Sequence, residues 1–286
     1  MPNNMQAKIL IIGCGDLGTK IATDLQSLAY EVIGLRVSDK QLPASIMTIR
    51  ADVTQPKTLR KLKEIQPDYL IYCVAGSAKT NSDIDDNYRL HYVEGLRYVL
   101  ATQQANPHLK HVFFISSTRV YGQKTEGILD ETITAIAGDA GGARLLEAES
   151  LLKNLPCGGT ALRLSGIYGP DRRRMIKLAQ QPDLWPAKNG WSNRIHRDDA
   201  AAFIVYLIKL LQQHKPIADC YIVTDIMPTT QYQTLNWIAA QMHLKVSMET
   251  PPVAGGKRLS NQRMLQTGFT LRYPDYQVGY AALLGQ

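Results

Sequence analysis

Three glycines near the start of the chain have the spacing of a phosphate-binding turn. Gly13, Gly15 and Gly18 follow the pattern G-x-G-x-x-G, with an apolar strand before them and an amphipathic helix pattern after them. In such a turn the first glycine permits the sharp bend, the second lets the backbone approach a pyrophosphate, and the third lets the helix pack closely on the strand. The unpaired N–H groups at the helix start, where Asp16 and Leu17 lie, favour an anion. A glycine turn can also be purely structural, but this context predicts a bound dinucleotide.

The elements that must position this turn alternate between strands and helices. Apolar runs predict strands, and helical patterns between them predict helices. Because each crossover must return over a face of the sheet, this order predicts an α/β fold, a doubly wound parallel sheet with helices on both faces. After the strand that enters the glycine turn, the expected strands are 31–35, 47–51, 69–75, 111–116 and 160–164, and the expected helices are 56–66, 87–106 and 141–154.

The regular alternation lapses after Gly169, where three prolines, Pro170, Pro182 and Pro186, interrupt the pattern. A helix over 198–213, a strand over 220–223 and a helix over 231–242 are expected beyond them. We therefore expect a dinucleotide-binding domain over 1–168, to which 190–225 returns. A smaller C-terminal α+β lobe would consist of 169–190 and 226–286.

The composition is that of an ordinary globular protein. The 286 residues are 45% hydrophobic and 20% charged, which is enough to bury a sizeable core. No apolar run approaches the ~20 residues that cross a bilayer, and the start, 1–6, lacks the features of a secretion signal. We expect a soluble, cytoplasmic protein that does not bind membranes.

The four cysteines, Cys14, Cys73, Cys157 and Cys220, show no C-x-x-C pairing. Cys14 and Cys73 fall in segments expected to be buried. Reduced, structural thiols are therefore expected, and no metal site.

The net charge of +7 raises the question of nucleic acid. Basic residues gather at 172–174 and at Lys257, Arg258 and Arg263, but neither cluster is interleaved with the aromatic residues that base stacking requires. An anionic cofactor and an anionic small-molecule substrate account for the charge as well as nucleic acid would. We therefore expect small-molecule partners and no nucleic acid.

Further motifs follow the predicted strands. Residues 115–122 read Ile-Ser-Ser-Thr-Arg-Val-Tyr-Gly, residues 163–170 read Arg-Leu-Ser-Gly-Ile-Tyr-Gly-Pro, and 193–199 read Asn-Arg-Ile-His-Arg-Asp-Asp. In this order behind the glycine turn, they closely resemble the extended short-chain dehydrogenase/reductase superfamily, of the NAD-dependent epimerase/dehydratase type. The resemblance spans essentially the whole chain. It implies a Rossmann domain that holds NAD or NADP and a smaller lobe that closes over a substrate, often a nucleotide sugar.

The resemblance also implies a catalytic set, of which this chain keeps one member. In the family a Ser or Thr, a Tyr and a Lys four residues later, assisted by an Asn, move a hydroxyl proton while hydride passes to the nicotinamide. Ser117 stands at the Ser or Thr position. The helix expected to carry Tyr-x-x-x-Lys, around 139–147, contains neither residue, and Tyr92 stands at the Asn position. The chain thus resembles an atypical member of the superfamily.

Other phenols are candidates for the missing proton carrier. They are Tyr121, Tyr168 and Tyr92, and the positive charge of Arg144 would assist a neighbouring phenol. We assign Tyr121, with Ser117, to the catalytic site. The alternative for each phenol is packing or lining of the cleft. The histidine of the Ile-His-Arg-Asp-Asp segment, His196, is interpreted as an architectural residue.

Residues at the ends of the second, third and fourth strands are predicted to contact the cofactor. An acidic residue after the second strand usually binds the ribose of NAD, whereas an arginine there pairs with the 2′-phosphate of NADP. Arg36, with Ser38, therefore favours NADP over NAD. In the alternative, Arg36 stacks on the adenine or faces solvent and Asp39 binds the ribose. The resemblance adds contacts at the adenine, from Asp52 and Val53, and at the nicotinamide ribose, from Ala75 and Gly76.

Hydroxyls and cations after the later strands are predicted to contact the substrate. We assign Thr118, Tyr168, Arg172 and Arg194 to this role, because guanidinium groups bind a diphosphate through paired hydrogen bonds. Further cations that would help are Arg173, Arg174, Lys177, Lys257 and Arg258. The alternative for 172–174 is a solvated surface helix.

Two functional hypotheses remain. The first is an NAD(P)-dependent oxidoreductase or epimerase that acts on a nucleotide sugar or a similar anionic small molecule with a non-standard proton carrier. The second is a non-catalytic, NAD(P)-sensing regulatory protein. The missing dyad favours the second, whereas Ser117 and the arginine-rich lobe favour the first, which we adopt. A monomer or a homodimer is expected, the dimer through helices 87–106 and 141–154.

Overall fold

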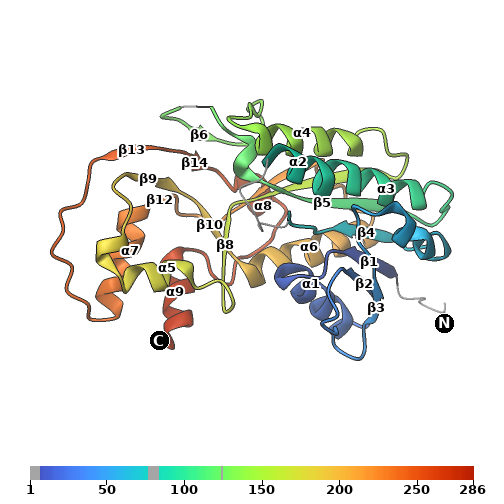
Figure 1. Cartoon of the computed structure of the whole chain (residues 1–286), viewed down its shortest axis with the longest axis horizontal. Helices are drawn as coiled ribbons and strands as arrows, with labels where there is room; N and C mark the ends of the chain where they lie inside the picture. Colours follow the sequence, from blue (N-terminus) through green and yellow to red (C-terminus); the bar gives the residue numbers. More distant parts are fainter. Residues whose placement is uncertain (1–6, 77–83, 124) are drawn as a thin grey trace. The chain divides into compact units, whose positions relative to one another are not determined.

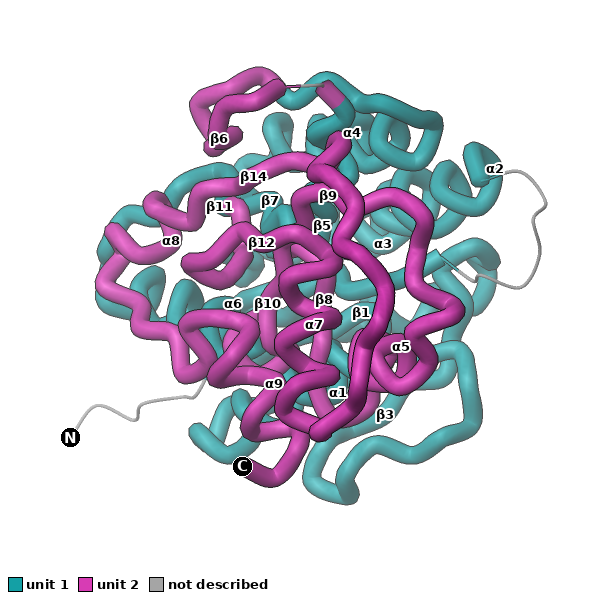
Figure 2. Tube along the Cα trace, turned by 90° about the vertical axis from the view of Figure 1, so that its left-hand side faces the viewer, with its two compact units in different colours: residues 1–122, 135–163, 201–221 teal, residues 123–134, 164–200, 222–286 magenta. Residues whose placement is uncertain are grey.

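The computed structural model describes residues 7–76, 84–123 and 125–286, so the start of the chain, 1–6, lies outside the described residues. Two compact units are distinguished by colour in Figure 2. The first consists of 1–122, 135–163 and 201–221, and the second consists of 123–134, 164–200 and 222–286.

A seven-stranded sheet has the strand order β11-β7-β5-β4-β1-β2-β3. The pairs among β1 to β5 are parallel. This is the Rossmann order, in which the chain reverses direction across the sheet between β1 and β4, and it confirms the predicted doubly wound α/β fold. The strands are β1 (Lys8–Ile12), β2 (Glu31–Arg36), β3 (Met47–Arg50), β4 (Tyr69–Tyr72), β5 (His111–Ser117), β7 (Gly159–Leu164) and β11 (Cys220–Val223).

Helices cover both faces of this sheet. In Figure 1, α3 and α4 lie above β4 and β5, and α1 and α6 lie below these two strands. The apolar runs of β1 and β4 are therefore buried on both sides, as near-continuous hydrophobic strands require. The helices are α1 (Asp16–Ser27), η1 (Pro56–Glu64), α2 (Ile84–Tyr88), η2 (Arg89–Glu94), α3 (Gly95–Thr102), η3 (Thr118–Val120), α4 (Ala140–Leu152) and α6 (Arg197–Gln212).

Two predicted helices differ in type from the expectation. The segment predicted as a helix over 87–106 begins with α2, passes through the π-helical turn η2 and continues as α3. The segment predicted as a helix over 56–66 is a 3₁₀ helix, η1. A helical pattern alone does not separate i→i+3, i→i+4 and i→i+5 hydrogen bonding, because all three place apolar residues on one face.

The second unit is built from short strands and helices around an aromatic core. Its core includes Tyr168, Trp185, Tyr232, Tyr276 and Tyr280. The elements are β6 (Ile128–Leu129), β8 (Gly166–Tyr168), α5 (Arg174–Ala179), η4 (Pro182–Leu184), β9 (Asn189–Ser192), β10 (Arg194–His196), β12 (Thr229–Thr230), α7 (Gln231–Gln241), β13 (Val253–Gly256), β14 (Arg258–Leu259), α8 (Gln262–Gln266) and α9 (Tyr276–Leu284).

The limits of the units differ from the predicted domain limits because of pairings distant in sequence. β6 pairs with β14, and β8 pairs with β10. Residues 123–134 and 164–168, which we expected in the dinucleotide-binding domain, therefore lie in the second unit. So do 190–200 and 222–225 of the segment expected to return to that domain, of which only 201–221 lie in the first unit.

The four cysteines are free. Cys14 is buried as expected, and burial raises the pKa of its thiol to about 12. Cys73, which was expected to be buried, is half-buried because it follows the end of β4. No helix in the described part of the chain is long and apolar enough to cross a membrane.

Candidate functional site

The glycine turn lies between β1 and α1, and two of its glycines are required by close backbone contacts. Gly13 has a φ of +96°, and a Cβ there would lie 2.6 Å from the carbonyl oxygen of Cys73. A Cβ on Gly18 would lie 2.3 Å from the carbonyl oxygen of Gly13. The turn is therefore packed between the end of β4 and the first turn of α1, so any larger residue at either position would displace backbone.

Gly15 differs from the other two because nothing fills the space beside it. It is the N-cap of α1, with no side-chain cap hydrogen bond, and a Cβ there would meet no heavy atom within 4 Å. An uncapped helix start leaves N–H groups for an external acceptor, and the macrodipole favours an anion there. The turn therefore fits a pyrophosphate, with the backbone of Gly15, Asp16 and Leu17 as the groups that would hold it.

Arg36 ends β2 next to this turn. Its Nε donates a hydrogen bond to Ser38 Oγ at 3.1 Å. The alternative ribose ligand, Asp39, instead pairs with Arg50 across 2.5 Å. The arginine and the serine hydroxyl together offer donors to an anion, whereas the Asp39 carboxylate is already engaged by a cation.

The other predicted cofactor residues follow β3 and β4. Asp52 accepts hydrogen bonds from the backbone N–H and the hydroxyl of Thr54, at 2.9 and 2.8 Å, and Val53 is buried. After β4, Ala75 is exposed, and the N–H of Gly76 lies 3.4 Å from the phenol oxygen of Tyr92. These residues are therefore brought to the carboxyl edge of the sheet, where ligands of this fold bind.

Ser117 and Thr118 lie at the end of β5. Ser117 caps η3, its Oγ accepting a hydrogen bond from the N–H of Arg119 at 3.2 Å. Ser117 is half-buried, and Thr118 is buried. Of the two hydroxyls, that of Ser117 is the more accessible to a ligand at the strand ends.

The phenol of Tyr121 is engaged in an internal network. Its side chain is 1% exposed, and its oxygen accepts a hydrogen bond from Arg163 Nη1 at 2.6 Å. Arg163 also pairs with Glu149, which accepts a hydrogen bond from Ser116. A proton carrier must reach the reacting atom, so this placement does not favour Tyr121 in that role.

Helix α4 contains neither a tyrosine nor a lysine. Arg144, the cation considered in their place, makes two hydrogen bonds with Asp85, at 2.7 and 2.8 Å, and one with Glu147 at 2.7 Å. These hydrogen bonds, with Asp85 first, hold the pKa of Arg144 above its ordinary value. Arg144 therefore connects α2 to α4 within the first unit, as one partner of a carboxylate cluster.

One cluster near Ser117 was missed by the sequence analysis. Arg119 Nη1 donates a hydrogen bond to the phenol oxygen of Tyr88 at 2.8 Å, and Arg119 Nε donates to Asp139 at 2.9 Å. The rings of Tyr88 and Tyr92 lie 4.8 Å apart between centroids. The available signal was the four-residue spacing of Tyr88 and Tyr92, which places two phenols on one helix face.

Of the three predicted substrate residues in the second unit, two are buried and one is exposed. Tyr168 is buried, and no described residue hydrogen-bonds its hydroxyl. Arg194 is also buried, donating to Thr229 and Ser192 at 2.6 Å each. Arg172 is exposed. Of these three residues, Arg172 is therefore the one that is accessible to a ligand in solution at the surface of the second unit.

His196 is enclosed by aromatic rings of the same unit. The ring of Tyr273 lies 3.9 Å away and that of Tyr168 lies 5.2 Å away, between centroids. Its Nδ1 accepts a hydrogen bond from the N–H of Asp198. This is the environment of a packed histidine at the start of α6.

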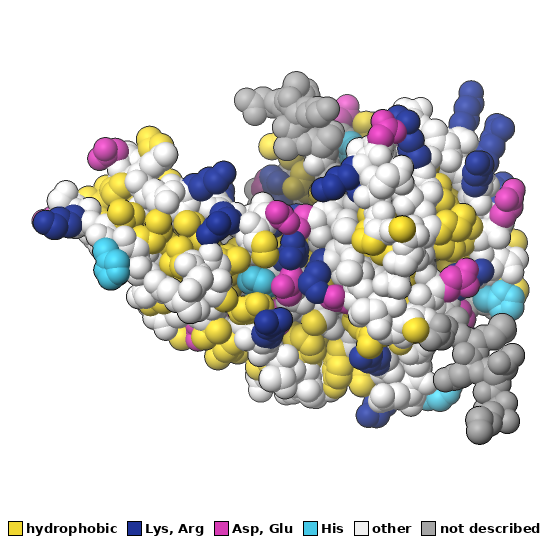
Figure 3. All heavy atoms as spheres, turned by 90° about the horizontal axis from the view of Figure 1, so that it is seen from below, with side chains coloured by type: hydrophobic (Ala, Val, Ile, Leu, Met, Phe, Trp, Pro, Cys, Tyr) yellow, Lys and Arg dark blue, Asp and Glu magenta, His cyan; other side chains and the backbone are white. Residues whose placement is uncertain are grey.

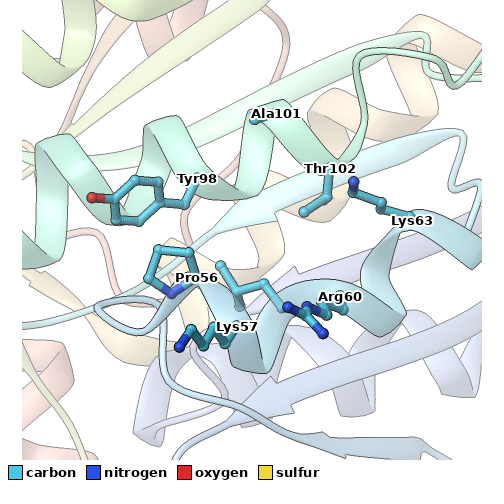
Figure 4. A pocket seen from close by; sticks show the side chains of 8 residues that line it. Pro56, Lys57, Arg60, Lys63, Tyr98, Ala101 and Thr102 are labelled. Carbon is cyan, nitrogen blue, oxygen red and sulfur yellow. The ribbon is translucent and has the colours of Figure 1, made fainter.

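A basic pocket lies between η1 and α3, apart from the residues predicted for the cofactor and substrate. Its volume is about 340 Å³, and Lys57, Arg60 and Lys63 line it with Tyr98 (Figure 4). The three cations lie in one row because residues three apart eclipse in a 3₁₀ helix. On the face shown in Figure 3, Lys and Arg side chains otherwise lie in small groups interspersed with acidic ones.

Comparisons with known proteins agree with this geometry. The model of the family described as "NAD dependent epimerase/dehydratase family" matches residues 9–218. Protein YeeZ of Escherichia coli K12 is 25% identical over 285 residues, covering 94% of this chain and 97% of that protein.

Two solved structures extend the comparison. A Methylobacillus flagellatus protein, described as a "putative NAD-dependent epimerase/dehydratase", is 49% identical with a TM-score of 0.89, covering 98% of each chain. The UDP-glucose 4-epimerase of Thermus thermophilus, solved in complex with NAD, is 15% identical with a TM-score of 0.77, covering 97% of this chain and 99% of that one. At that identity the second match shows the fold alone.

Proposed function

Because the chain belongs to the NAD-dependent epimerase/dehydratase family, we propose that it is an oxidoreductase or epimerase that binds a nicotinamide dinucleotide at the glycine turn. The observation that carries the proposal is the start of α1, where Gly15 leaves open space and no side chain caps the helix. Backbone N–H groups at Gly15, Asp16 and Leu17 would bind the pyrophosphate. When bound, the nicotinamide supplies the donor or acceptor of hydride.

Arg36 and Ser38 support a preference for NADP over NAD. The guanidinium and the hydroxyl are already oriented toward each other, so both can donate to a 2′-phosphate without a large loss of side-chain entropy. Asp39 is held by Arg50. At the end of β2 the chain therefore has two donors for a phosphate, Arg36 and Ser38, and the carboxylate of Asp39 is already paired.

A nucleotide sugar or a similar anionic small molecule is the proposed substrate. In the first unit, Ser117 is the proposed ligand of a hydroxyl or carbonyl oxygen of the substrate. In the second unit, the exposed Arg172 is a proposed ligand of an anionic group. On the face shown in Figure 3 the cations lie in small, separated groups, and on that face this favours a small anionic ligand over a nucleic acid. One protein of this fold that was solved with NAD, from Thermus thermophilus, is a UDP-glucose 4-epimerase.

A non-catalytic NAD(P)-sensing protein is the second candidate, favoured by the absence of tyrosine and lysine from α4. One experiment separates the two candidates. The purified chain is titrated with NAD and NADP by calorimetry and is then incubated with the bound cofactor and a panel of nucleotide sugars. Binding with turnover supports the enzyme, and binding without turnover supports the sensor. If neither dinucleotide binds, both candidates are wrong.

A further inference from the structure

Two phenols and one guanidinium meet beside Ser117. Arg119 Nη1 lies 2.8 Å from the Tyr88 oxygen, and the guanidinium carbon lies 4.9 Å from the centroid of the Tyr88 ring. Arg119 follows Ser117 by two residues and donates its N–H to the Ser117 oxygen. One arginine therefore contacts both a phenol and the hydroxyl that the family resemblance implies in catalysis.

The two phenols lie where α2 continues into the π-helical turn η2. Tyr88 is the last residue of α2 and precedes η2, which contains Tyr92. π turns inside α-helices are rare and are frequent at functional sites. The two phenols have different environments: Tyr92 accepts a hydrogen bond from Gly76, and burial raises its pKa to about 12. Tyr92 therefore holds its proton tightly, whereas Tyr88 is the phenol that receives the hydrogen bond of a cation.

The start of α4 holds Arg119 in place. Both oxygens of Asp139 accept from Arg119 Nε, at 2.9 and 3.0 Å, and Asp139 also caps α4 by accepting from the N–H of Gly142. A Cβ on Gly141 would lie 2.8 Å from the guanidinium carbon. The guanidinium thus lies against the backbone of the helix on which the family carries its tyrosine and lysine, and it fits there because residue 141 has no side chain.

We propose that Tyr88 is the phenol that exchanges a proton with the substrate hydroxyl, and that Arg119 is the positioning residue that stabilises its charged form. The inference rests on the proposed function. In the oxidising direction the substrate O–H bond breaks as the O–H bond of Tyr88 forms. The carbon that bears this hydroxyl loses a hydride, a hydrogen with its electron pair, to an oxidised nicotinamide. The alcohol is thereby oxidised to a carbonyl. A guanidinium that donates to the phenol oxygen stabilises negative charge on that oxygen when it carries no proton.

The first test needs no substrate. Benzenesulfonyl fluoride forms a sulfonate ester with a phenol oxygen, losing fluoride, and reacts faster where a cation stabilises the phenolate. Labelling of the full chain is followed residue by residue by mass spectrometry, with Tyr30, a half-buried phenol whose hydroxyl donates a hydrogen bond to the neutral side chain of Gln212, as the internal reference. We expect Tyr88 to be labelled at least about tenfold faster than Tyr30, the difference to be lost in Arg119→Met, and Arg119→Lys to restore part of it.

Equal labelling of Tyr88 and Tyr30, or labelling of Tyr88 that is unchanged in Arg119→Met, would overturn the inference. Calorimetry with NAD and NADP on the same preparations tests the proposed function separately, because Tyr88 and Arg119 are not among the residues assigned to the dinucleotide. Normal binding with equal labelling therefore refutes the role of Tyr88 alone, and no binding refutes the proposed function.

The second test uses any nucleotide sugar that the wild-type protein converts. Tyr88→Phe removes the proton-carrying oxygen and should lower kcat by about 10²- to 10⁴-fold, with dinucleotide affinity unchanged. Tyr98→Phe is the matched control and should keep wild-type kcat. A Tyr88→Phe variant that folds and retains wild-type kcat would contradict the proposal.

Discussion

Glu149 and Arg163 form an ion pair between α4 and β7 that is almost withdrawn from solvent. Arg163 Nη2 lies 2.7 Å from Glu149 Oε2, and the two side chains are 11% and 10% exposed for Arg163 and Glu149 respectively. Ser116 and Tyr121 add hydrogen bonds to this pair. The network joins β7 to α4, the helix whose N-cap, Asp139, binds Arg119. The position of α4 therefore bears both on the stability of the first unit and on the placement of Arg119.

Removal of one partner of this pair should destabilise the first unit strongly. Glu149→Ala leaves the Arg163 charge buried without its carboxylate, which costs ~3–5 kcal/mol in the free energy of unfolding. Glu94→Ala is the matched control, because Glu94 pairs with Arg97 on the surface, and its effect should be at most ~1 kcal/mol. Urea unfolding measures both. Equal losses in the two variants would mean that burial of the Glu149 pair does not set its contribution.

Gly15→Leu should abolish dinucleotide binding without unfolding the protein. Gly15 has a φ of −78°, which other residues adopt, and a Cβ there has open space, so the side chain would occupy only the region assigned to the pyrophosphate. We expect an affinity loss of at least about tenfold, ~1.4 kcal/mol, by calorimetry. Gly127→Leu, at an exposed loop position, is the control. Unchanged affinity of Gly15→Leu for NAD and NADP would place the cofactor elsewhere.

Gly18→Ala, by contrast, should act on the fold. Its Cβ would lie 2.3 Å from a backbone oxygen of Gly13, so α1 must shift away from the turn. We expect a loss of ~1–3 kcal/mol in the free energy of unfolding, measured by urea, as for other overpacked sites. A variant as stable as the wild type would show that the turn adjusts to the added methyl group.

Arg36→Ala should weaken NADP more than NAD. A charge-assisted hydrogen bond to the 2′-phosphate is worth ~1.5–3 kcal/mol, so the NADP affinity should fall about tenfold or more while the NAD affinity changes little. Arg97→Ala, which removes an exposed arginine of α3 that pairs with Glu94 and is not among the residues assigned to the cofactor, is the control. Calorimetric titrations of both variants decide the point, and parallel losses for the two cofactors would exclude a phosphate-specific role of Arg36.

The stability of the second unit should fall as the pH rises between about 4 and 7. Burial raises the pKa of Asp225 from 3.8 to about 7, against the opposing charge of Arg194. Because the folded state binds this proton more tightly than the unfolded state, the folded protein is penalised once the pH exceeds the unfolded pKa. The penalty grows until the pH passes the folded pKa. A rise of this size corresponds to on the order of 4 kcal/mol.

Asp225→Asn tests this dependence directly. The amide keeps an oxygen to accept the hydrogen bond that Asp225 Oδ1 receives from Met227 and carries no charge. Thermal unfolding at pH 5 and pH 8 should therefore show a smaller loss of stability with pH for Asp225→Asn than for the wild type. Asp183→Asn, at an exposed position, should keep the wild-type dependence. An unchanged slope in Asp225→Asn would assign the titration to another group.

The sequence by itself determined the glycine turn, the alternation of strands and helices and the parallel sheet. These features depend on residues close together in the sequence. The glycine turn needs Gly13, Gly15 and Gly18 at a fixed spacing, and each strand or helix needs apolar residues at a regular period. The same local information marked Ser117 and Arg36 at strand ends.

Only the tertiary structure decided which side chains meet. Arg119 and Tyr88 are 31 residues apart, and the Arg119 guanidinium fits beside α4 because Gly141 has no side chain. Likewise, Tyr121 is buried, and its hydroxyl oxygen accepts a hydrogen bond from Arg163, 42 residues away. Periodicity predicts which face of an element is buried, but the partner across an interface depends on how several elements pack at once, and that is why the choice of phenol could not be read from the chain alone.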